Sequence, residues 1–266
     1  MILKKALMHS VNSVAAQLVE KTGPEAVIET AHRCGIKSRL NNVFSVALGS
    51  SGVSPLEMAS GFATFATGGI AHEPFWIRRV EDFRGRVLEE QIISGKRRLD
   101  AGISYQLVDM MRGVMDHGTG AITRRLGFKL PAAGKTGTTN DYRDAWFTGF
   151  TPNLCTSVWV GFDQNTVMRD KNKVGITGGR GAGPIWTDFM MKATAGEPPR
   201  EFSLPDDIRF ETVNPVNGLI DPTSEKALRV ALRRGQMIEQ IPETVIDSGD
   251  IDLDPKLFDI FGGTEE

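Results

Sequence analysis

A run of small and hydroxyl-bearing residues around Lys135 could hold a carboxylate against an extended strand. It lies within Leu130 to Phe150, which reads LPAAGKTGTTNDYRDAWFTGF. The residues before the lysine have little side-chain bulk, so an extended ligand could lie along the backbone and pair with it as an added strand. The lysine supplies positive charge, the threonine hydroxyls supply donors, and the glycine permits close approach. The candidate binding residues are therefore Lys135, Thr136, Gly137, Thr138 and Thr139.

The letters GKT also occur in phosphate-binding loops, which would imply a nucleotide ligand. Such a loop requires a glycine five residues before Gly134, but that position is Lys129. It should also open a helix, whereas the residues that follow are typical of a strand. A second KTG, Lys21 to Gly23, follows an amphipathic run and precedes Pro24, as at a junction between two helices. The triplet alone is weak evidence, and its context favours the carboxylate-binding strand.

A proton carrier facing this strand could come from the triplet Ser10, Val11 and Asn12. It interrupts the amphipathic run ALMHSVNSVAAQL, where serine and asparagine are poor helix-interior choices unless a turn or a function retains them. The alternative is that these residues only cap or terminate a helix. The residues by themselves leave both interpretations open.

Hydrophobic periodicity, together with the positions of glycine, proline and capping residues, predicts the elements that position these residues. The predicted helices are Leu3 to Val19, Pro24 to Cys34, Ser54 to Gly68 with a capping box at Glu57, Asp100 to Asp116, Ala121 to Leu126, and Pro184 to Ala195. A hairpin is predicted for Phe75 to Asp82 with Gly85 to Ile92. Three antiparallel strands are predicted next: the first bears Lys135, the second is Tyr142 to Thr151 and the third is Cys155 to Phe162. Gly175 to Gly183 is predicted to be a flexible loop.

Composition restricts the class of protein. The 266 residues, 40% of them hydrophobic, are enough for a sizeable core, and a net charge of −2 gives no support for a nucleic-acid partner. No apolar run approaches the ~20 residues of a membrane helix, and no signal peptide is evident. The two cysteines, Cys34 and Cys155, are predicted to be buried small hydrophobes, and the four histidines lack ligand spacing, so neither a metal nor a cofactor is expected.

The end of the chain differs in kind from the rest. Residues 196–205 are rich in proline and charge, and residues 239–266 hold nine acidic residues against the single Lys256. We therefore predict a main domain over 1–198, a small C-terminal appendage over 199–238, and an acidic, disordered tail over 239–266.

Together these motifs resemble those of the penicillin-recognising serine transpeptidases, which carry SxxK, SxN and KTG. SVN at Ser10 to Asn12 matches the second motif and KTGTT the third. The similarity is greatest to the class A, bifunctional penicillin-binding proteins of the 1A type, through ALGSSGVSPLEMASGFATFATGG, MMRGVMDHGTG and GKTGTTNDYRDAWFTGFTP. It spans about residues 3–194. The fold implied is the α+β fold shared with β-lactamases, an antiparallel sheet flanked by helices.

The resemblance also implies an activity and its residues. Such enzymes cross-link peptidoglycan stem peptides at D-Ala-D-Ala through an acyl-enzyme and are acylated by β-lactams. Lys135 would supply positive potential and move protons, Thr136 and Thr138 would hold the substrate carboxylate, and the Thr138 N–H would form half of the oxyanion hole. Ser10 would relay a proton to the leaving amine, and Asn12 would orient the substrate amide. The implied location is the periplasmic face of the bacterial inner membrane.

One motif of the family is missing, because no serine in the sequence is followed three residues later by lysine. We therefore expect an N-terminally incomplete transpeptidase domain that is inactive alone, its partner being the missing N-terminal part of the same protein with a glycosyltransferase domain and a membrane anchor. Two alternatives remain. The chain could be a non-catalytic module that binds peptide termini or β-lactams, or it could be a serine β-lactamase-like hydrolase.

Overall fold

A computed structural model describes residues 1–221 and 226–238. The helical elements are α1 (Leu3–Met8), α2 (Asn12–Thr22), α3 (Pro24–Arg33), the 3-10 helix η1 (Phe44–Leu48), α4 (Pro55–Ala66), α5 (Ala101–His117), α6 (Ile122–Arg125), the π-helix η2 (Gly178–Ala182) and α7 (Gly183–Ala193). The strands are β1 (Ile70–His72), β2 (Arg79–Glu81), β3 (Val87–Glu90), β4 (Gly95–Arg97), β5 (Ala133–Thr138), β6 (Asp144–Phe150), β7 (Cys155–Gly161), β8 (Ile208–Val213) and β9 (Leu228–Arg233).

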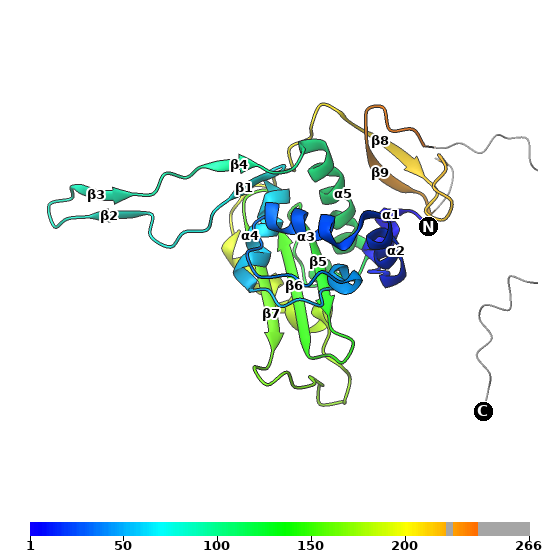
Figure 1. Cartoon of the computed structure of the whole chain (residues 1–266), viewed down its shortest axis with the longest axis horizontal. Coiled ribbons are helices and arrows are strands. Elements are labelled where there is room, and N and C mark those ends of the chain that lie inside the picture. Colours follow the sequence, from blue (N-terminus) through cyan, green and yellow to red (C-terminus); the bar gives the residue numbers. More distant parts are fainter. Residues whose placement is uncertain (222–225, 239–266) are drawn as a thin grey trace, which may run out of the picture.

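The predicted sheet is confirmed as the antiparallel order β5-β6-β7, with helices on both faces (Figure 1). Alternation along β6 points Phe147 to one face and Phe150 to the other. Phe147 packs against Trp186 of α7, with ring centroids 5.2 Å apart, whereas Phe150 packs against Phe62 of α4 at 6.3 Å. Each face of the sheet thus has its own apolar layer, and the fold is α+β as predicted.

Local sequence signals fix several elements as predicted. The capping box is present at the start of α4, where the Glu57 carboxylate accepts from the Ser54 N–H at 2.9 Å and the Ser54 side chain accepts from the Glu57 N–H. Gly23, with φ of 79°, ends α2, and Pro24 begins α3, so the second KTG is a helix junction. Cys34 is buried and Cys155 partly buried, and burial raises the pKa of the Cys155 thiol to about 12. In the part of the chain described, no helix is long and apolar enough to cross a membrane.

The prediction of one helix over Leu3 to Val19 is wrong, because the helix breaks after Met8. Ser10 adopts φ of 54°, in the left-handed region, and α2 starts afresh at Asn12. The cause is tertiary: the Met8 carbonyl accepts a hydrogen bond from the Thr119 N–H at 3.0 Å, across from the end of α5.

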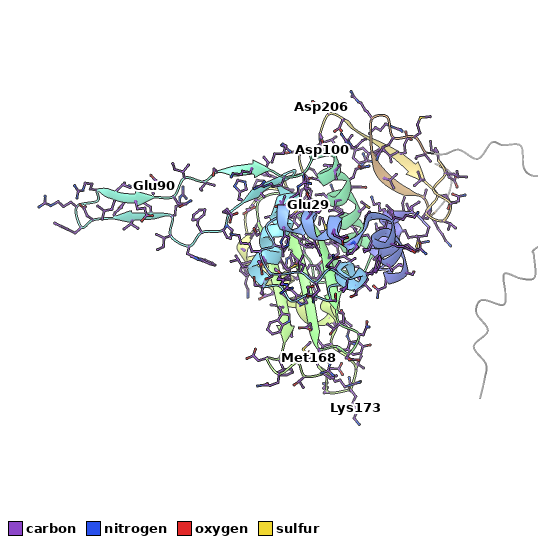
Figure 2. All side chains as sticks on the ribbon, in the orientation of Figure 1. Glu29, Glu90, Asp100, Met168, Lys173 and Asp206 are labelled. Atoms are coloured by element: carbon purple, nitrogen blue, oxygen red, sulfur yellow. The ribbon has the colours of Figure 1, made fainter. Side chains whose placement is uncertain are left out.

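The predicted hairpin over residues 75–92 is confirmed, with shorter strands, and forms a projecting arm. β2 and β3 form its outer part, and β1 pairs with β4 at its base, which the sequence did not indicate. The arm extends well away from the body in Figure 1, and in Figure 2 the labelled Glu90 lies far out along it.

The predicted loop over Gly175 to Gly183 is also partly wrong, because residues 178–182 form the π-helix η2. Gly178 lies so close to the sheet that a Cβ there would be 2.2 Å from the Trp146 carbonyl oxygen, which only glycine permits. Beyond α7, β8 and β9 form an antiparallel hairpin that packs on α5, within the range predicted for the appendage. The predicted acidic tail, residues 239–266, lies outside the described residues.

Candidate functional site

The outer edge of β5 is open to an added strand. β5 pairs only with β6 among the described strands, with Thr138 opposite Ala145. The Thr139 N–H donates to the Asp144 carbonyl oxygen at 3.1 Å, so Thr139 and Asp144 form a hydrogen-bonded pair of this ladder. Because inward and outward N–H groups alternate in an antiparallel ladder, the N–H groups of Thr136 and Thr138 point to the open edge. An extended ligand could pair there.

Lys135 and Ser10, which lie 125 positions apart in the sequence, meet beside this edge. The Lys135 Nζ donates to the Ser10 Oγ at 2.7 Å and to the Thr136 carbonyl at 2.9 Å. No carboxylate forms an ion pair with Lys135 within the described residues. Burial lowers the pKa of Lys135 from its ordinary value of 10.5 to about 8. The ammonium therefore has one donor left and a proton that it gives up more readily than an exposed lysine does.

The break between α1 and α2 carries Ser10 to this position. The Ser10 N–H donates to the Leu7 carbonyl at 3.1 Å and the Val11 N–H to the Ala6 carbonyl at 3.0 Å, which ends the helix. The N-cap of α2 is Val11, and no side chain caps that helix. The prediction that these residues terminate a helix is confirmed, but Ser10 does not cap α2, and its hydroxyl contacts Lys135 instead.

Sequence reasoning missed one residue at the site, Thr119, which links the two motifs. Its N–H donates to the Met8 carbonyl at 3.0 Å, and its Oγ1 lies 2.7 Å from the Thr136 Oγ1. The preceding Gly118 lies so close that a Cβ would be 2.2 Å from the Met8 carbonyl oxygen. The available signal was HGTG directly after a long helix, where glycines flank a single threonine.

The remaining predicted residues are placed differently from one another. The Thr138 Oγ1 accepts from the Gly178 N–H at 2.9 Å, which leaves its own O–H free to donate. The Thr139 Oγ1 accepts from the N–H groups of Arg143 at 2.8 Å and Asp144 at 3.0 Å, so it closes the β5–β6 turn. Asn12 is exposed, and its side chain makes no hydrogen bond in the described part of the chain.

The site lies along the edge of β5, where Lys135, Thr136 and Gly137 are half-buried and Thr138 is exposed. Two hollows of the described structure lie elsewhere, one beside α3 and the other at the base of the arm, and neither is lined by Ser10 or Lys135. An extended ligand at β5 could be oriented by backbone pairing and by the charge of Lys135.

The chain is similar to known proteins of one family. Residues 1–190 match the model of the penicillin binding protein transpeptidase domain. Penicillin-binding protein 1A of Aquifex aeolicus is 38% identical over 224 residues, covering 84% of this chain and 30% of that protein. Penicillin-binding protein 2D of Bacillus subtilis is 34% identical over 222 residues, covering 81% and 31%. The chain thus spans about a third of the length of these relatives.

Solved structures give the same result. The crystal structure of penicillin-binding protein 1A from Haemophilus influenzae superposes with a TM-score of 0.80 at 25% identity, covering 90% of this chain and 41% of that chain. The PonA1 protein of Mycobacterium tuberculosis in complex with penicillin V gives 0.69 at 28% identity, covering 76% and 59%. With the family model matching well over half of its length, the chain belongs to the penicillin-binding protein transpeptidase family.

Proposed function

We propose that this chain forms the KTG-bearing side of a peptidoglycan D-Ala-D-Ala transpeptidase site, which is also a target of β-lactams. The observation that carries the proposal is the 2.7 Å hydrogen bond from the Lys135 Nζ to the Ser10 Oγ. It joins two motifs, distant in sequence, at an open strand edge. A cell-wall peptide that ends in a carboxylate has the extended backbone and the negative charge that this edge fits.

Each residue has a role that follows from its place. The Thr138 O–H and the remaining Lys135 donor would hold the substrate carboxylate, while the outward Thr138 N–H would stabilise the oxyanion of the attacked carbonyl. The Ser10 hydroxyl accepts from Lys135 and can donate to the leaving amine, so it would relay a proton between them. With a pKa of about 8, Lys135 can gain or lose this proton near neutral pH. Asn12, exposed at the start of α2, would orient the substrate amide.

The acylating serine is proposed to lie outside this chain. The 266 residues contain no Ser-x-x-Lys, and the chain corresponds to about a third of its relatives. We place that serine, a glycosyltransferase domain and a membrane anchor in the remaining length of the same protein. The edge of β7 away from β6 has no strand partner in the part of the chain described, and the missing strands would pair there. The location would be the periplasmic face of the inner membrane.

A binding experiment tests the site without requiring turnover. A peptide ending in D-Ala-D-Ala is titrated into the chain, and amide shifts are followed by NMR. We expect the largest shifts at Thr136 and Thr138, and loss of binding in Lys135→Met. The matched control is Lys192→Met, which removes an exposed lysine on α7. Equal peptide affinity for wild type and Lys135→Met would refute the proposal.

Incubation with a fluorescent penicillin separates this proposal from its alternatives. We expect no covalent label on the chain alone, because the acylating serine is not in its sequence, and no hydrolysis of a chromogenic cephalosporin. Label that appears once the upstream part of the protein is added would support the transpeptidase. Noncovalent binding with no label in either case would instead support a binding module, the alternative that the absence of Ser-x-x-Lys from the whole protein would favour. Cephalosporin hydrolysis would support a β-lactamase-like hydrolase.

A further inference from the structure

The β8–β9 hairpin lies beyond the residues that match the transpeptidase domain model, which end at 190. It nevertheless packs on α5 and lies beside α1 (Figure 1). The Ile2 N–H, just before α1, donates to the Pro215 carbonyl in the connection between β8 and β9 at 3.3 Å. At its other end α1 leads to Ser10, two positions after the helix stops. The contacts between the hairpin and α1 therefore bear on the position of Ser10.

The outer edge of β9 has no strand beside it in the described part of the chain, and side chains of two helices take the place of one. The Ala231 N–H donates to the Asp109 Oδ2 at 3.1 Å, and the Ala231 carbonyl accepts from the Gln106 Nε2 at 3.0 Å. The Arg229 carbonyl, two residues earlier on the same edge, accepts from the Lys4 Nζ at 2.6 Å. Polar groups that would otherwise be open to an added strand are thus satisfied by α1 and α5.

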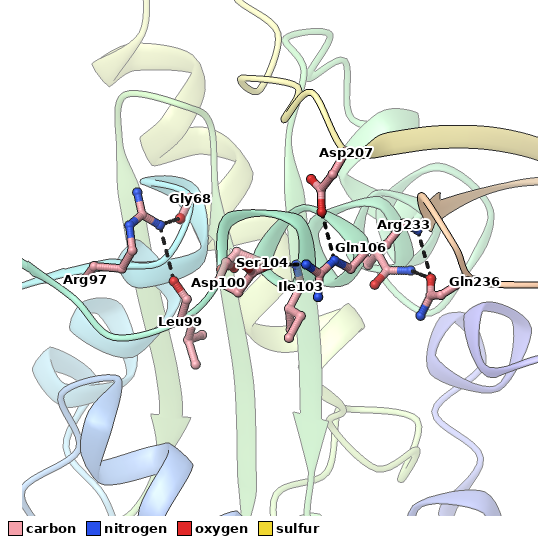
Figure 3. Close-up of polar contacts among 10 residues, drawn as sticks. All are labelled: Gly68, Arg97, Leu99, Asp100, Ile103, Ser104, Gln106, Asp207, Arg233 and Gln236. Carbon is pink, nitrogen blue, oxygen red and sulfur yellow. Dashed lines mark hydrogen bonds and ion pairs between the residues drawn. The ribbon is translucent and has the colours of Figure 1, made fainter.

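Further contacts hold the hairpin to α5 at several points (Figure 3). Beyond the end of β9, the Gln236 Oε1 accepts from the Gln106 Nε2 at 2.8 Å. The Arg233 Nε donates to the Asp207 Oδ2 at 2.9 Å, and its Nη2 lies 3.6 Å from the Asp100 Oδ1 at the start of α5. The hairpin therefore contacts α5 from the N-cap of that helix to its middle.

One ion pair joins α1, α5 and β9. The Lys4 Nζ lies 2.8 Å from the Asp109 Oδ2, and the two side chains are only 12% and 14% exposed. Lys4 also donates to β9, and Asp109 also accepts from it, so the three elements meet at this pair. Removal of either partner leaves the other charge poorly solvated and without a counterion, which costs far more than loss of an exposed ion pair.

The face of α1 that bears Lys4 also sets the position of Ser10. Lys4 and Met8 are one turn apart and both lie over Gly113 of α5, where a Cβ would be 2.8 Å from the Met8 Sδ and 3.5 Å from the Lys4 Cε. The Met8 carbonyl accepts from the Thr119 N–H, and Ser10 follows. Because α1 has only six residues, it is too short to be stable without such packing. Contacts at both of its ends therefore determine where Ser10 lies.

We propose that Lys4 is a positioning residue, through which the β8–β9 hairpin and α5 hold α1 so that the Ser10 hydroxyl stays in contact with Lys135. This inference rests on the proposed function and adds to it a part of the chain beyond the residues that match the domain model. The hairpin then acts on the site through α1, although the site residues described above all lie outside it.

The titration of Lys135 tests this role without any ligand. Burial lowers the pKa of Lys135 to about 8, so a loosened α1 that admits water should raise it towards 10.5. In folded Lys4→Met, followed by NMR of the Lys135 side chain, we expect the proton affinity of Lys135 to increase at least about tenfold. Lys4→Arg keeps the charge and the donors and should restore the wild-type titration. A general loss of stability would not move this pKa while the chain stays folded.

Lys5→Met is the matched control, because it removes the next lysine of the same helix. The Lys5 ammonium makes no hydrogen bond or ion pair in the described structure, so the titration of Lys135 should not change. An unchanged Lys135 pKa in folded Lys4→Met, or an equal change in Lys5→Met, would overturn the positioning role.

Peptide affinity separates this inference from the proposed function. A peptide ending in D-Ala-D-Ala should bind several-fold more weakly to Lys4→Met than to wild type, and Lys4→Arg should restore the affinity. If the wild type binds no peptide but Lys135 responds to Lys4→Met as expected, the proposed function fails and the positioning role stands. If the peptide binds wild type and Lys4→Met equally, the positioning role fails and the proposed function stands.

Amide hydrogen exchange in the wild-type chain provides a test that requires no substitution. If the hairpin and α1 are held as one unit, the N–H groups of Ala231 and Thr119 should open together, with protection factors within about tenfold of each other and the same dependence on urea. A hairpin that opens by itself, so that the Ala231 N–H exchanges more than about tenfold faster than the Thr119 N–H, would overturn the proposal.

Discussion

The buried ammonium of Lys135 should make the stability of this chain depend on pH in a defined window. Its pKa is about 8 in the folded chain and near the ordinary value of 10.5 when unfolded. Below pH 8 both states bind the proton, and the folded state bears the full cost of burying the charge, about 3 kcal/mol. Between pH 8 and 10.5 the unfolded state binds more protons than the folded state, so the free energy of unfolding rises with pH.

This linkage can be isolated by comparison with Lys135→Met, which keeps the length of the side chain and removes the proton. The wild type should gain about 2 kcal/mol relative to Lys135→Met between about pH 7 and about pH 9.5. Urea unfolding at several pH values measures both proteins, and titration of other groups cancels in the difference. Lys192→Met controls for loss of an exposed lysine and should change stability by no more than ~0.5 kcal/mol. A difference between wild type and Lys135→Met that stays flat over this window would refute the burial argument.

Three further substitutions test separate parts of the site and its support. Ser10→Gly and Ser10→Ala both remove the hydroxyl. The left-handed backbone at this position costs alanine ~1–2 kcal/mol, whereas glycine loses ~0.5–1 kcal/mol through its greater conformational entropy in the unfolded chain. The glycine variant should therefore have the higher melting temperature. Thr119→Val should weaken D-Ala-D-Ala peptide binding several-fold by freeing Thr136, with little change in melting temperature, and Thr119→Ser should restore binding. Burial raises the pKa of Glu57, but the hydrogen bonds that its carboxylate accepts outweigh burial and hold the pKa at about 2. Glu57→Gln should therefore remove a contribution to stability that the wild type loses only as the pH falls below about 4. Equal acid unfolding of both proteins would contradict this.

Elements encoded by neighbouring residues were predictable from the sequence. The capping box of α4 needs only residues three positions apart, and the strands β5 to β7 follow from alternating patterns and one turn. The residues at Ser10 to Asn12 allowed a break but could not decide it, because the Met8 carbonyl at the break contacts Thr119, far away in the sequence. η2 was missed for the same reason, since glycine-rich sequence indicates a loop unless the sheet that Gly178 approaches is known.

The site itself was predicted unevenly. The pairing of Ser10 with Lys135 came from the resemblance, and the structure shows the contact. Thr119 was missed, because its role exists only when α1 and β5 lie on either side of it. The roles of all the predicted site residues remain predictions. The structure gives Thr139 a turn-closing part, which short-range spacing could not distinguish from ligand binding.

Strain alone does not single out Ser10. Among the described residues, three others outside glycine have positive φ, namely Tyr142, Asn165 and Lys173, and all of them lie in loops. Ser10 differs because it joins two helices and its hydroxyl contacts a buried lysine that has no carboxylate partner in the described structure. The strained backbone of Ser10 and the desolvated charge of Lys135 therefore belong to two residues whose side chains are in contact. Each costs a noticeable part of the ~5–15 kcal/mol by which domains are stable, so neither would be expected where stability is the only demand. The proton relay that we propose would explain their coincidence, because it needs a lysine that can lose its proton and a hydroxyl fixed within hydrogen-bonding distance of it.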